Sequence, residues 1–455
     1  MRNFAKNPQL IALCLGFFLS FGLQSCKDAP DSASQQALTT DETVAIDEQN
    51  SREIHPVLGE GEVVITGPEQ LIMEYLPLMQ GRKIGLVANH TSLVFNGKHL
   101  VDTLVGSGIE LVRVFAPEHG FRGTADAGQA VKSGIDTETG LPIVSLYGKQ
   151  KKPLPEHLKD LDVILFDIQD IGSRHYTYIS TMAYVMEACA ENQKPFWILD
   201  RPNPNGWYVD GPMMEEGNES FIGMHKIPIV HGMTIGEYAT MINEEGWLTN
   251  GIKADINVIP SYGYTHAMRW EQTGLGWVPP SPNIATEYAA YLYPALCWLE
   301  PTPVSIGRGT DSAFIIVGAP WYQAGATART ESGTHSFFGL EMKLIDFTPR
   351  SLPGKSTRPK FEDEQCSGGI FTNRVDGKTL FLAGIHLFKD LYQQHQESGT
   401  SESFFMKRFS RWPGNTTFRQ QIESDMSAED IYQSWQEETD KFRQIRSKYL
   451  LYPEQ

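Results

Sequence analysis

Short apolar runs alternate with helix-like stretches from residue 83 onward, and this alternation constrains the fold more than any other feature. Strands are predicted at 83–88, 110–116, 142–146, 162–166 and 195–199, with helices at 99–106 and 177–191. Runs this apolar, separated by helices, are typical of parallel strands that are covered on both faces. The sequence therefore predicts an α/β fold built on a doubly wound, mostly parallel open sheet.

Polar residues follow four of these strands at the points where the strands end. The four polar loops begin at Asn89, Pro117, Asp167 and Asp200, and glycine and proline punctuate them. In an open parallel sheet the carboxyl ends of the strands share one edge, where ligands bind. We therefore expect a ligand site along this edge of the sheet.

The regular alternation ends near residue 206, and the second half of the chain is less regular. A helix is predicted at 236–247 and a strand at 255–260, followed by the proline-rich connector 277–283. Because proline fixes its own φ and disfavours helix before it, this connector suggests a domain boundary. We predict an N-terminal domain over 62–284 and a smaller C-terminal domain over 285–455. The latter includes helices at 288–299 and 427–449 and a strand at 313–317.

The first 26 residues have the pattern of an export signal. Arg2 and Lys6 precede a short apolar run, and Leu23-Gln-Ser-Cys26 resembles the lipobox of bacterial lipoproteins. We expect residues 1–25 to be a lipoprotein signal peptide, Cys26 to be lipidated, and residues 26–61 to be a flexible polar tether. The protein would then be an exported lipoprotein of the periplasm or outer membrane, and one possible location is the cell surface. The alternative is an ordinary signal with a chance cysteine.

The charge balance argues against nucleic-acid binding. The chain carries 38 basic and 55 acidic side chains, a formal net charge of −17, and such a surface repels polyphosphate. Cys189, Cys297 and Cys366 are widely and irregularly spaced. That spacing fits neither a zinc site nor a disulfide framework, so buried free thiols are expected.

Familiar signatures are missing from the sequence, including Gly-x-Gly-x-x-Gly, a Walker loop and Gly-x-Ser-x-Gly. What remains is a set of loop carboxylates: Glu118, Asp126, Asp167, Asp170, Asp200 and Glu300. Paired carboxylates suit glycoside hydrolysis, and they equally suit a Mg²⁺ site. Glu118 is the first choice for a general acid, because it directly follows an apolar strand where partial burial would keep it protonated. Its alternative role is a helix cap or an ion pair with Arg122.

Other residues of the same loops could bind an acidic or sugar-like ligand. Arg122, Arg174, Arg201 and Arg308 could each grip a carboxylate through two hydrogen bonds, although internal pairing with nearby aspartates is expected for at least two of them. Asp167 and Asp170 could instead hold a loop arginine. The remaining candidates for substrate binding are Asn89, His90, His119, Tyr176, Asp200 and Asn203.

Four motifs together resemble one known family. They are residues 115–123 (Phe-Ala-Pro-Glu-His-Gly-Phe-Arg-Gly), 166–178, 199–204 and 305–310 (Ser-Ile-Gly-Arg-Gly-Thr). The chain resembles the NamZ-type exo-β-N-acetylmuramidases over about residues 65–453, a family formerly known only as a domain of unknown function. The resemblance implies a Rossmann-like N-terminal domain, a smaller α+β C-terminal domain, and an active site in the cleft between them.

The resemblance also implies an activity, namely release of N-acetylmuramic acid from the non-reducing ends of peptidoglycan fragments. The family's proposed catalytic glutamate falls on Glu118, while Asp167, Asp170 and Glu300 stay open as the second carboxylate. The family usually has Glu-Gly-Thr-Asn where this chain has Glu300-Pro-Thr-Pro; Glu300 is therefore in place, while the departure argues against a direct role for residues 301–303. No cofactor and no metal are expected. The alternatives are a non-catalytic muropeptide-binding lipoprotein and a metal-dependent hydrolase built on Asp167 and Asp170.

Overall fold

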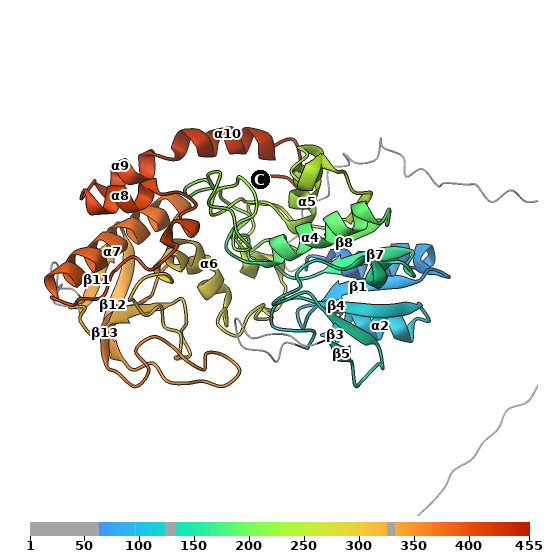
Figure 1. Ribbon diagram of the computed structural model, residues 1–455, viewed down its shortest axis with the longest axis horizontal. Coiled ribbons are helices and arrows are strands. Elements are labelled where there is room, and N and C mark those ends of the chain that lie inside the picture. Colours follow the sequence, from blue (N-terminus) through green and yellow to red (C-terminus); the bar gives the residue numbers. More distant parts are fainter. Residues whose placement is uncertain (1–62, 96, 123–132, 325–332) are drawn as a thin grey trace, which may run out of the picture. The chain divides into compact units, whose positions relative to one another are not determined.

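Two β-sheets form the framework of the protein, seen in a computed structural model (Figure 1). The structure describes residues 63–455 except residue 96 and the segments 123–132 and 325–332. The larger sheet has seven strands: β1 (Ile84–Ala88), β4 (Leu111–Ala116), β5 (Gly134–Ile135), β6 (Pro142–Ser145), β7 (Val163–Asp167), β8 (Phe196–Leu199) and β9 (Ile256–Ile259). Two further short strands, β2 (Leu93–Val94) and β3 (Lys98–His99), pair with each other in an antiparallel ribbon.

The strand order of the larger sheet is β5-β6-β4-β1-β7-β8-β9, and all pairs except β5–β6 are parallel. Counting only the parallel strands, the order is third, second, first, fourth, fifth, sixth. This is the Rossmann order, in which the direction of winding reverses between the first and fourth strands, here β1 and β7. The predicted α/β class with a mostly parallel, doubly wound sheet is confirmed.

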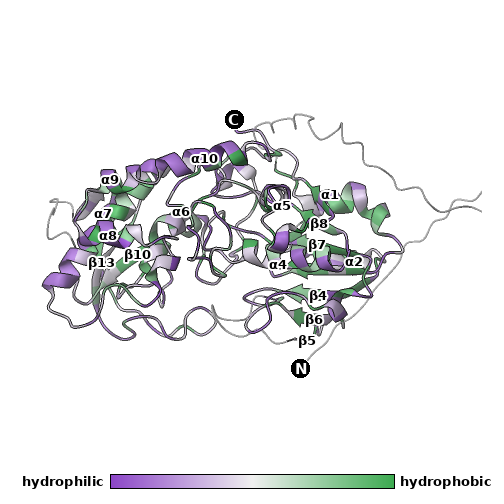
Figure 2. Ribbon diagram, turned by 45° about the horizontal axis from the view of Figure 1, so that its top comes forward, coloured by the Kyte–Doolittle hydropathy of each residue, from purple (hydrophilic) through white to green (hydrophobic). Residues whose placement is uncertain are grey.

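The central strands are buried on both faces, which explains their unbroken apolar sequences. In β7, Ile164 and Phe166 belong to one apolar cluster, while Val163 and Leu165 belong to another. The first cluster includes α4 (Tyr178–Glu191) and α5 (Ile235–Glu244), and the second includes α2 (Leu100–Gly106). Successive side chains of a strand point to opposite faces, so helices cover both sides of this sheet. Figure 2 shows the hydrophobic strands between helices of mixed hydropathy.

The smaller sheet is antiparallel, with the order β10-β13-β12-β11. Its strands are β10 (Ile316–Ala319), β11 (Thr334–Phe337), β12 (Leu340–Phe347) and β13 (Cys366–Phe371). The associated helices are α6 (Glu287–Leu296), α7 (Gly377–Glu397), α8 (Thr417–Glu423), α9 (Ala428–Gln433) and α10 (Gln436–Arg446). The sequence analysis did not predict β11, β12, β13 or α7, although Asp376 caps α7 by accepting a hydrogen bond from the Thr379 amide at 3.0 Å.

Two predicted elements differ in detail. The strand expected at 313–317 begins at Ile316, because the amides of Ile315 and Ile316 both donate to the Ser312 carbonyl in a turn. Phe314 within this turn has a φ of 61°, which a strand does not permit. The helix expected at 427–449 is two helices, α9 and α10, which meet near Ser434.

One apolar cluster extends through both halves of the described chain, from Val87 and Phe166 to Leu380 and Phe442. The boundary predicted near residue 284 stays a prediction. Cys189, Cys297 and Cys366 are buried free thiols, as expected. None of the helices described is both long and apolar enough to cross a membrane. The predicted signal peptide (residues 1–25), Cys26 and the predicted tether (residues 26–61) lie outside the described residues.

The last residues of the chain bind the larger sheet through two buried carboxylates. The Tyr452 hydroxyl donates to Asp200 Oδ2 at 2.6 Å, and the Leu451 amide donates to Glu237 Oε1 at 2.8 Å. Asp200 Oδ1 accepts from the Gly236 amide, near the start of α5, at 2.9 Å. Burial raises the pKa of Asp200 to about 6, so its ionised form depends on these donors.

We expect Tyr452→Phe to lower the free energy of unfolding by about 1–3 kcal/mol, because it leaves a buried carboxylate oxygen without its donor. The Tyr452 hydroxyl stabilises the ionised form of Asp200. The loss of folding free energy should therefore be full at pH 8 and should shrink as the pH falls through about 6, where Asp200 becomes protonated. Urea unfolding at pH 8 and pH 4.5 measures both effects. Tyr449→Phe is the control, since its hydroxyl binds Glu245 nearer the surface; equal losses in the two variants at both pH values would contradict this account.

Candidate active site

Glu118 lies in a tight turn directly after β4, at the carboxyl-end edge of the sheet. The Gly120 amide donates to the Pro117 carbonyl at 3.1 Å and closes this turn. His119 and Gly120 both have left-handed backbones, with φ values of 70° and 78°. A buried non-glycine residue in this region is strained, and such strain concentrates at functional sites. The turn therefore holds Glu118 in one orientation at some cost in stability.

Two hydroxyl groups bind the carboxylate of Glu118, one on each oxygen. Tyr147 donates to Oε1 at 2.8 Å, and Thr177 donates to Oε2 at 2.9 Å. Burial, together with the charge of Glu118, raises the pKa of Tyr147, so the phenol keeps its proton and acts as the donor. The sequence analysis missed both residues. Their positions carried a signal, because Tyr147 comes just after β6 and Thr177 just before α4.

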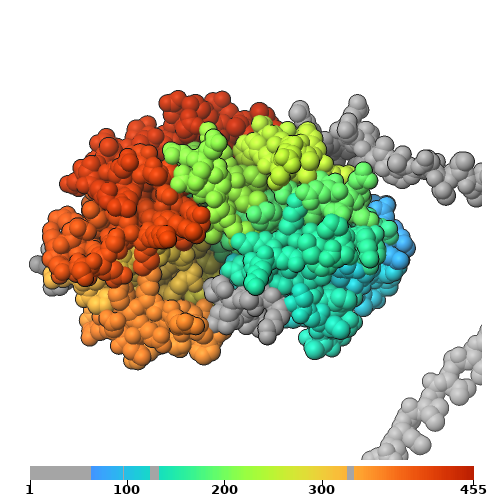
Figure 3. Space-filling view, viewed as in Figure 1, coloured from blue at the N-terminus to red at the C-terminus, as the bar shows by residue number. Residues whose placement is uncertain are grey.

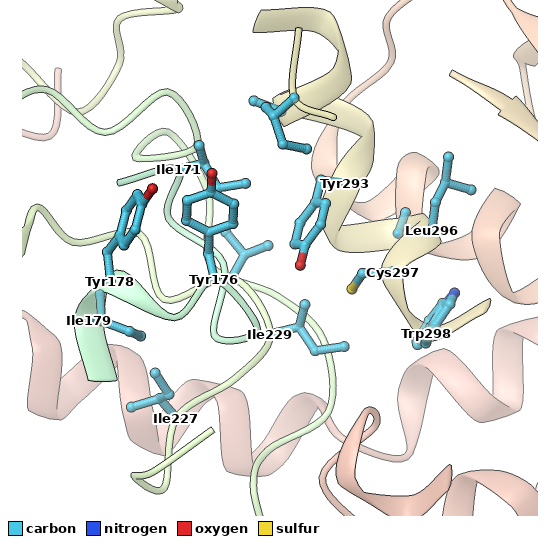
Figure 4. Close-up of a cluster of buried hydrophobic side chains, with 14 of the residues drawn as sticks. Ile171, Tyr176, Tyr178, Ile179, Ile227, Ile229, Tyr293, Leu296, Cys297 and Trp298 are labelled. Atoms are coloured by element: carbon cyan, nitrogen blue, oxygen red, sulfur yellow. The ribbon is translucent and has the colours of Figure 1, made fainter. Parts of the chain in front are cut away.

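Three tyrosines lie near Glu118 and connect the two halves of the chain. Tyr176 packs edge-on against Tyr178, with ring centres 5.1 Å apart, and against Tyr293 of α6 at 5.9 Å. Figure 4 shows Tyr176 between the other two rings. Burial raises the pKa of each tyrosine, and the charge of Glu118 contributes in all three cases. Tyr178 belongs to α4 and Tyr293 to α6, so the charge of Glu118 acts on residues of both helices.

Glu300 and Arg308 form an ion pair beside this group. Nε and Nη2 of Arg308 both donate to Glu300 Oε1, at 3.0 and 2.6 Å. Burial alone would lower the pKa of Arg308, but Glu300, with a smaller contribution from Glu118, raises it. The charges of both Glu300 and Glu118 therefore act on Arg308. The predicted residues Glu118, Tyr176, Glu300 and Arg308 are brought together.

A cavity of about 440 Å³ lies on the C-terminal side of this ion pair. Its walls are Glu300, Val304, Ser305, Ile306, Arg308, Lys355, Ser356, Thr357, Arg358, Pro359, Lys360 and Trp412. In the space-filling view the olive part of the chain, which contains α6, is recessed between orange and teal surfaces (Figure 3). A cavity of this size matches small-molecule sites.

Asp167 and Arg201 are paired with each other. Nε and Nη2 of Arg201 donate to the two oxygens of Asp167 at 2.6 and 3.1 Å, and Nη2 also donates to the Leu93 carbonyl. Asp167 has no exposed surface. This arrangement ties the ends of β7 and β8 together and uses both carboxylate oxygens.

Asp170 is a second buried carboxyl on the same loop. Its Oδ2 accepts from the Gly172 amide at 2.7 Å, and its Oδ1 is buried with no hydrogen-bond partner among the described residues. Burial raises the pKa of Asp170 to about 7. Gly172 has a φ of 73°, and a Cβ there would stand 2.1 Å from Asn203 Oδ1. Glycine is therefore required for the loop to pack against Asn203.

Arg122 and Arg174, the other two predicted arginines, also bind protein groups. Arg122 donates to both oxygens of Asp136, at 3.2 and 2.8 Å. Arg174 is fully buried, and its Nη atoms bind the carbonyls of Pro212, Ile227, Trp412 and Pro413 at 2.8–2.9 Å. Arg174 thus fastens the loop after β7 to a C-terminal loop, which is a structural position.

The remaining predicted residues also have local partners. Asn89 Oδ1 accepts from the amide and hydroxyl of Thr91, and His90 Nε2 donates to the Pro279 carbonyl at 2.7 Å. Asn203 Nδ2 donates to the Met233 carbonyl at 2.8 Å. His119 is buried in the Glu118 turn, and Asp200 holds α5 and the chain end as described above. Direct roles of these residues in binding stay predictions.

The side chains that the structure describes include no group of three or more His, Cys, Asp or Glu that could hold a metal ion. Asp126, one of the loop carboxylates, lies outside the described residues.

Comparison with known proteins identifies relatives over most of the described region. Residues 84–288 match the family model "Exo-beta-N-acetylmuramidase NamZ, N-terminal", and residues 291–452 match its C-terminal counterpart. The chain is 38% identical over 392 residues to the peptidoglycan beta-N-acetylmuramidase NamZ of Bacillus subtilis (strain 168), covering 86% of this chain and 91% of that protein.

Two crystal structures of DUF1343 family proteins from Bacteroides fragilis NCTC 9343 are also similar. Their TM-scores are 0.72 and 0.74 at 37% and 32% sequence identity, and both comparisons cover 86% of this chain and 99% of the other. With both family models matched in order over most of its length, this chain belongs to the NamZ exo-β-N-acetylmuramidase family, formerly DUF1343.

Proposed function

We propose that this protein removes N-acetylmuramic acid from the non-reducing ends of peptidoglycan fragments, with Glu118 as the general acid. Membership of the family makes the chain a glycosidase. The observation that carries the proposal is the position of Glu118, held by Tyr147 and Thr177 at the carboxyl-end edge of the sheet, where its charge also helps to raise the pKa of Arg308. The B. subtilis relative, named as a peptidoglycan β-N-acetylmuramidase, supports the substrate.

In this mechanism Glu118 donates its proton to the glycosidic oxygen as the bond to the departing group breaks. Protonation of the leaving oxygen is the step that a carboxylic acid supplies in glycoside hydrolysis. The carboxyl must point in one direction to do so, and the strained His119 turn and the two hydroxyl donors supply that constraint. Tyr147 and Thr177 are therefore positioning residues.

Glu300 is our choice for the second carboxylate. Asp167 has both oxygens committed to Arg201 and no exposed surface. Glu300 is half-buried, lines the cavity, and receives the bonds of Arg308 on Oε1. A carboxylate paired with an arginine suits the role of base or nucleophile that accompanies the acid.

Two other functions make different predictions. A non-catalytic muropeptide-binding lipoprotein would bind N-acetylmuramic acid tightly and yield no product over a long incubation. A metal-dependent hydrolase built on Asp167 and Asp170 would lose turnover on exhaustive chelation. Our proposal expects product release that survives chelation.

We also propose that the protein is exported and anchored through Cys26, in the periplasm or outer membrane of a bacterium. The basic start, the short apolar run and Leu23-Gln-Ser-Cys26 support this. A tethered enzyme of this kind would work beside the cell wall, where its substrate occurs.

Glu118→Gln should reduce the release of muramic acid from a chromogenic β-muramide by about 100- to 10,000-fold, because the amide cannot supply the proton. The unfolding midpoint should stay near that of the wild type. Glu138→Gln is the matched control, since its carboxylate is exposed and pairs with Arg122 at the surface. Near-normal turnover in Glu118→Gln would remove this residue from the mechanism.

Tyr147→Phe should lower kcat by about 10- to 100-fold with a smaller change in KM, since it removes a hydrogen bond that orients the catalytic acid. Tyr184→Phe is the control, because Tyr184 packs on Phe221 as Tyr147 does. Steady-state kinetics on the same β-muramide separates the two parameters. An unchanged kcat in Tyr147→Phe would show that the phenol does not position Glu118.

The full-length protein, expressed in a bacterial host, should sediment with membranes and carry a lipid-sized mass increase at Cys26 after removal of residues 1–25. Cys26→Ser should release it into the soluble fraction, because stable anchoring requires acyl chains. Fractionation and mass spectrometry measure both properties. Membrane attachment that is equal in the two proteins would refute the lipid anchor.

A further inference from the structure

We propose that the cavity beside Glu300 and Arg308 is a carboxylate-binding subsite, in which Arg358 and Lys355 bind the acidic substituent on the terminal sugar. The inference rests on the proposed function, since it names what that site recognises. The chemistry to be recognised is a carboxylate carried at C3 of the sugar ring, either the free lactyl acid or the acid of an attached stem peptide.

The charge of the cavity is opposite to that of the protein. Four basic side chains line it, Arg308, Lys355, Arg358 and Lys360, and Glu300 is the carboxylate among the described wall residues. The chain as a whole has a formal net charge of −17. A cavity walled by cations in so acidic a protein concentrates positive potential where an anionic ligand enters.

Two of these cations are committed to the protein itself. Arg308 binds Glu300. Lys360 Nζ donates to the carbonyls of Glu300, Thr302 and Val304, at 2.7, 2.5 and 3.0 Å. Burial lowers the pKa of Lys360 to about 8, in keeping with a structural position that fastens the segment 300–304.

The other two cations are available to a ligand. Lys355 pairs with Asp311 at 2.9 Å, but the Asp311 side chain is 91% exposed, and exposed pairs of this kind contribute little. Arg358 is exposed on the cavity wall, and no described residue forms an ion pair or hydrogen bond with its guanidinium. A guanidinium binds a carboxylate through two parallel hydrogen bonds.

The loop that carries these residues is built against the Gly-Arg-Gly motif. The Arg350 amide donates to the Gly309 carbonyl at 2.9 Å, and Asn283 Nδ2 donates to the Lys355 carbonyl at 2.8 Å. Gly309 has a φ of 85°, and a Cβ there would lie 2.6 Å from Pro359. The glycine that follows Arg308 therefore allows the basic loop to approach, which links the motif to the subsite.

The apolar walls suit a carboxylate on a short stem. Val304, Ile306, Pro359 and Trp412 line the same cavity as the basic residues. A lactyl group joins an ether-linked carbon and a methyl group to its carboxylate, so it would meet apolar and cationic surface together. A sugar without this substituent would leave both surfaces unused.

The test compares two chromogenic β-muramides, one with a free lactyl acid and one with the lactyl amide, on the full enzyme. Arg358→Gln should raise KM for the acid by about 10- to 100-fold with kcat nearly unchanged, and should leave the amide unaffected. Arg350→Gln is the matched control, because Arg350 lies on the same loop but pairs with Asp363 at the surface. Equal effects on acid and amide, or none, would overturn the subsite.

A third substrate, in which the lactyl group is joined to alanine, distinguishes the two sources of the carboxylate. If Arg358→Gln raises KM for the alanyl substrate as well, the subsite also takes the peptide acid; if it does so only for the free acid, the subsite takes the lactyl group. Calorimetry with N-acetylmuramic acid separates this inference from the catalytic one. Binding that is weakened in Arg358→Gln supports the subsite even if no substrate is turned over, and binding equal to the wild type refutes it.

Discussion

The parallel pairing of six strands is the constraint on which the rest of this protein depends. It brings the carboxyl ends of β1, β4, β7 and β8 to one edge of the sheet, where Asn89, Glu118, Asp167 and Asp200 follow in turn. Beyond the ends of the strands, main-chain amides and carbonyls no longer form hydrogen bonds with a neighbouring strand, so side chains and neighbouring loops must supply those bonds. Most of the polar motif residues do this work: Asp200 binds the Gly236 amide and Asn203 binds the Met233 carbonyl.

Buried charged groups at this edge of the sheet bind other protein groups and so hold the loops together. Asp167 with Arg201 joins β7 to β8, and Arg174 fastens a loop through four carbonyls. Leaving either charge unpaired in the interior would be strongly destabilising. Glu118 accepts hydrogen bonds from the hydroxyl groups of Tyr147 and Thr177, which orient its carboxyl group.

The sequence predicted the sheet because its signal is local: unbroken apolar runs such as 163–166 cannot be exposed, and their spacing allows only parallel pairing through helices. Glu118 could be found for the same reason, since it directly follows a strand. The hydroxyl donors Tyr147 and Thr177 lie 29 and 59 residues from Glu118, and nothing in the local pattern joins them. The strands of the smaller sheet were not predicted because one face of an antiparallel sheet is exposed, so these strands lack an unbroken apolar run. The alternating burial at the start of β12 shows this.

The four arginines chosen from the sequence show why a motif and a ligand site need not coincide. Each lies near an aspartate, glutamate or carbonyl that the fold brings within hydrogen-bond distance, and an arginine with such a partner has already lost much of its capacity to bind a substrate. Arg358 belongs to none of the four motifs and reaches the cavity because Gly309 allows its loop to pack closely. No described residue pairs with the Arg358 side chain on the cavity wall, so contacts within the described part of the chain do not explain its position there. Recognition of an acidic sugar would supply that explanation, and Gly309 would then serve that function by allowing the basic loop to pack beside Arg308.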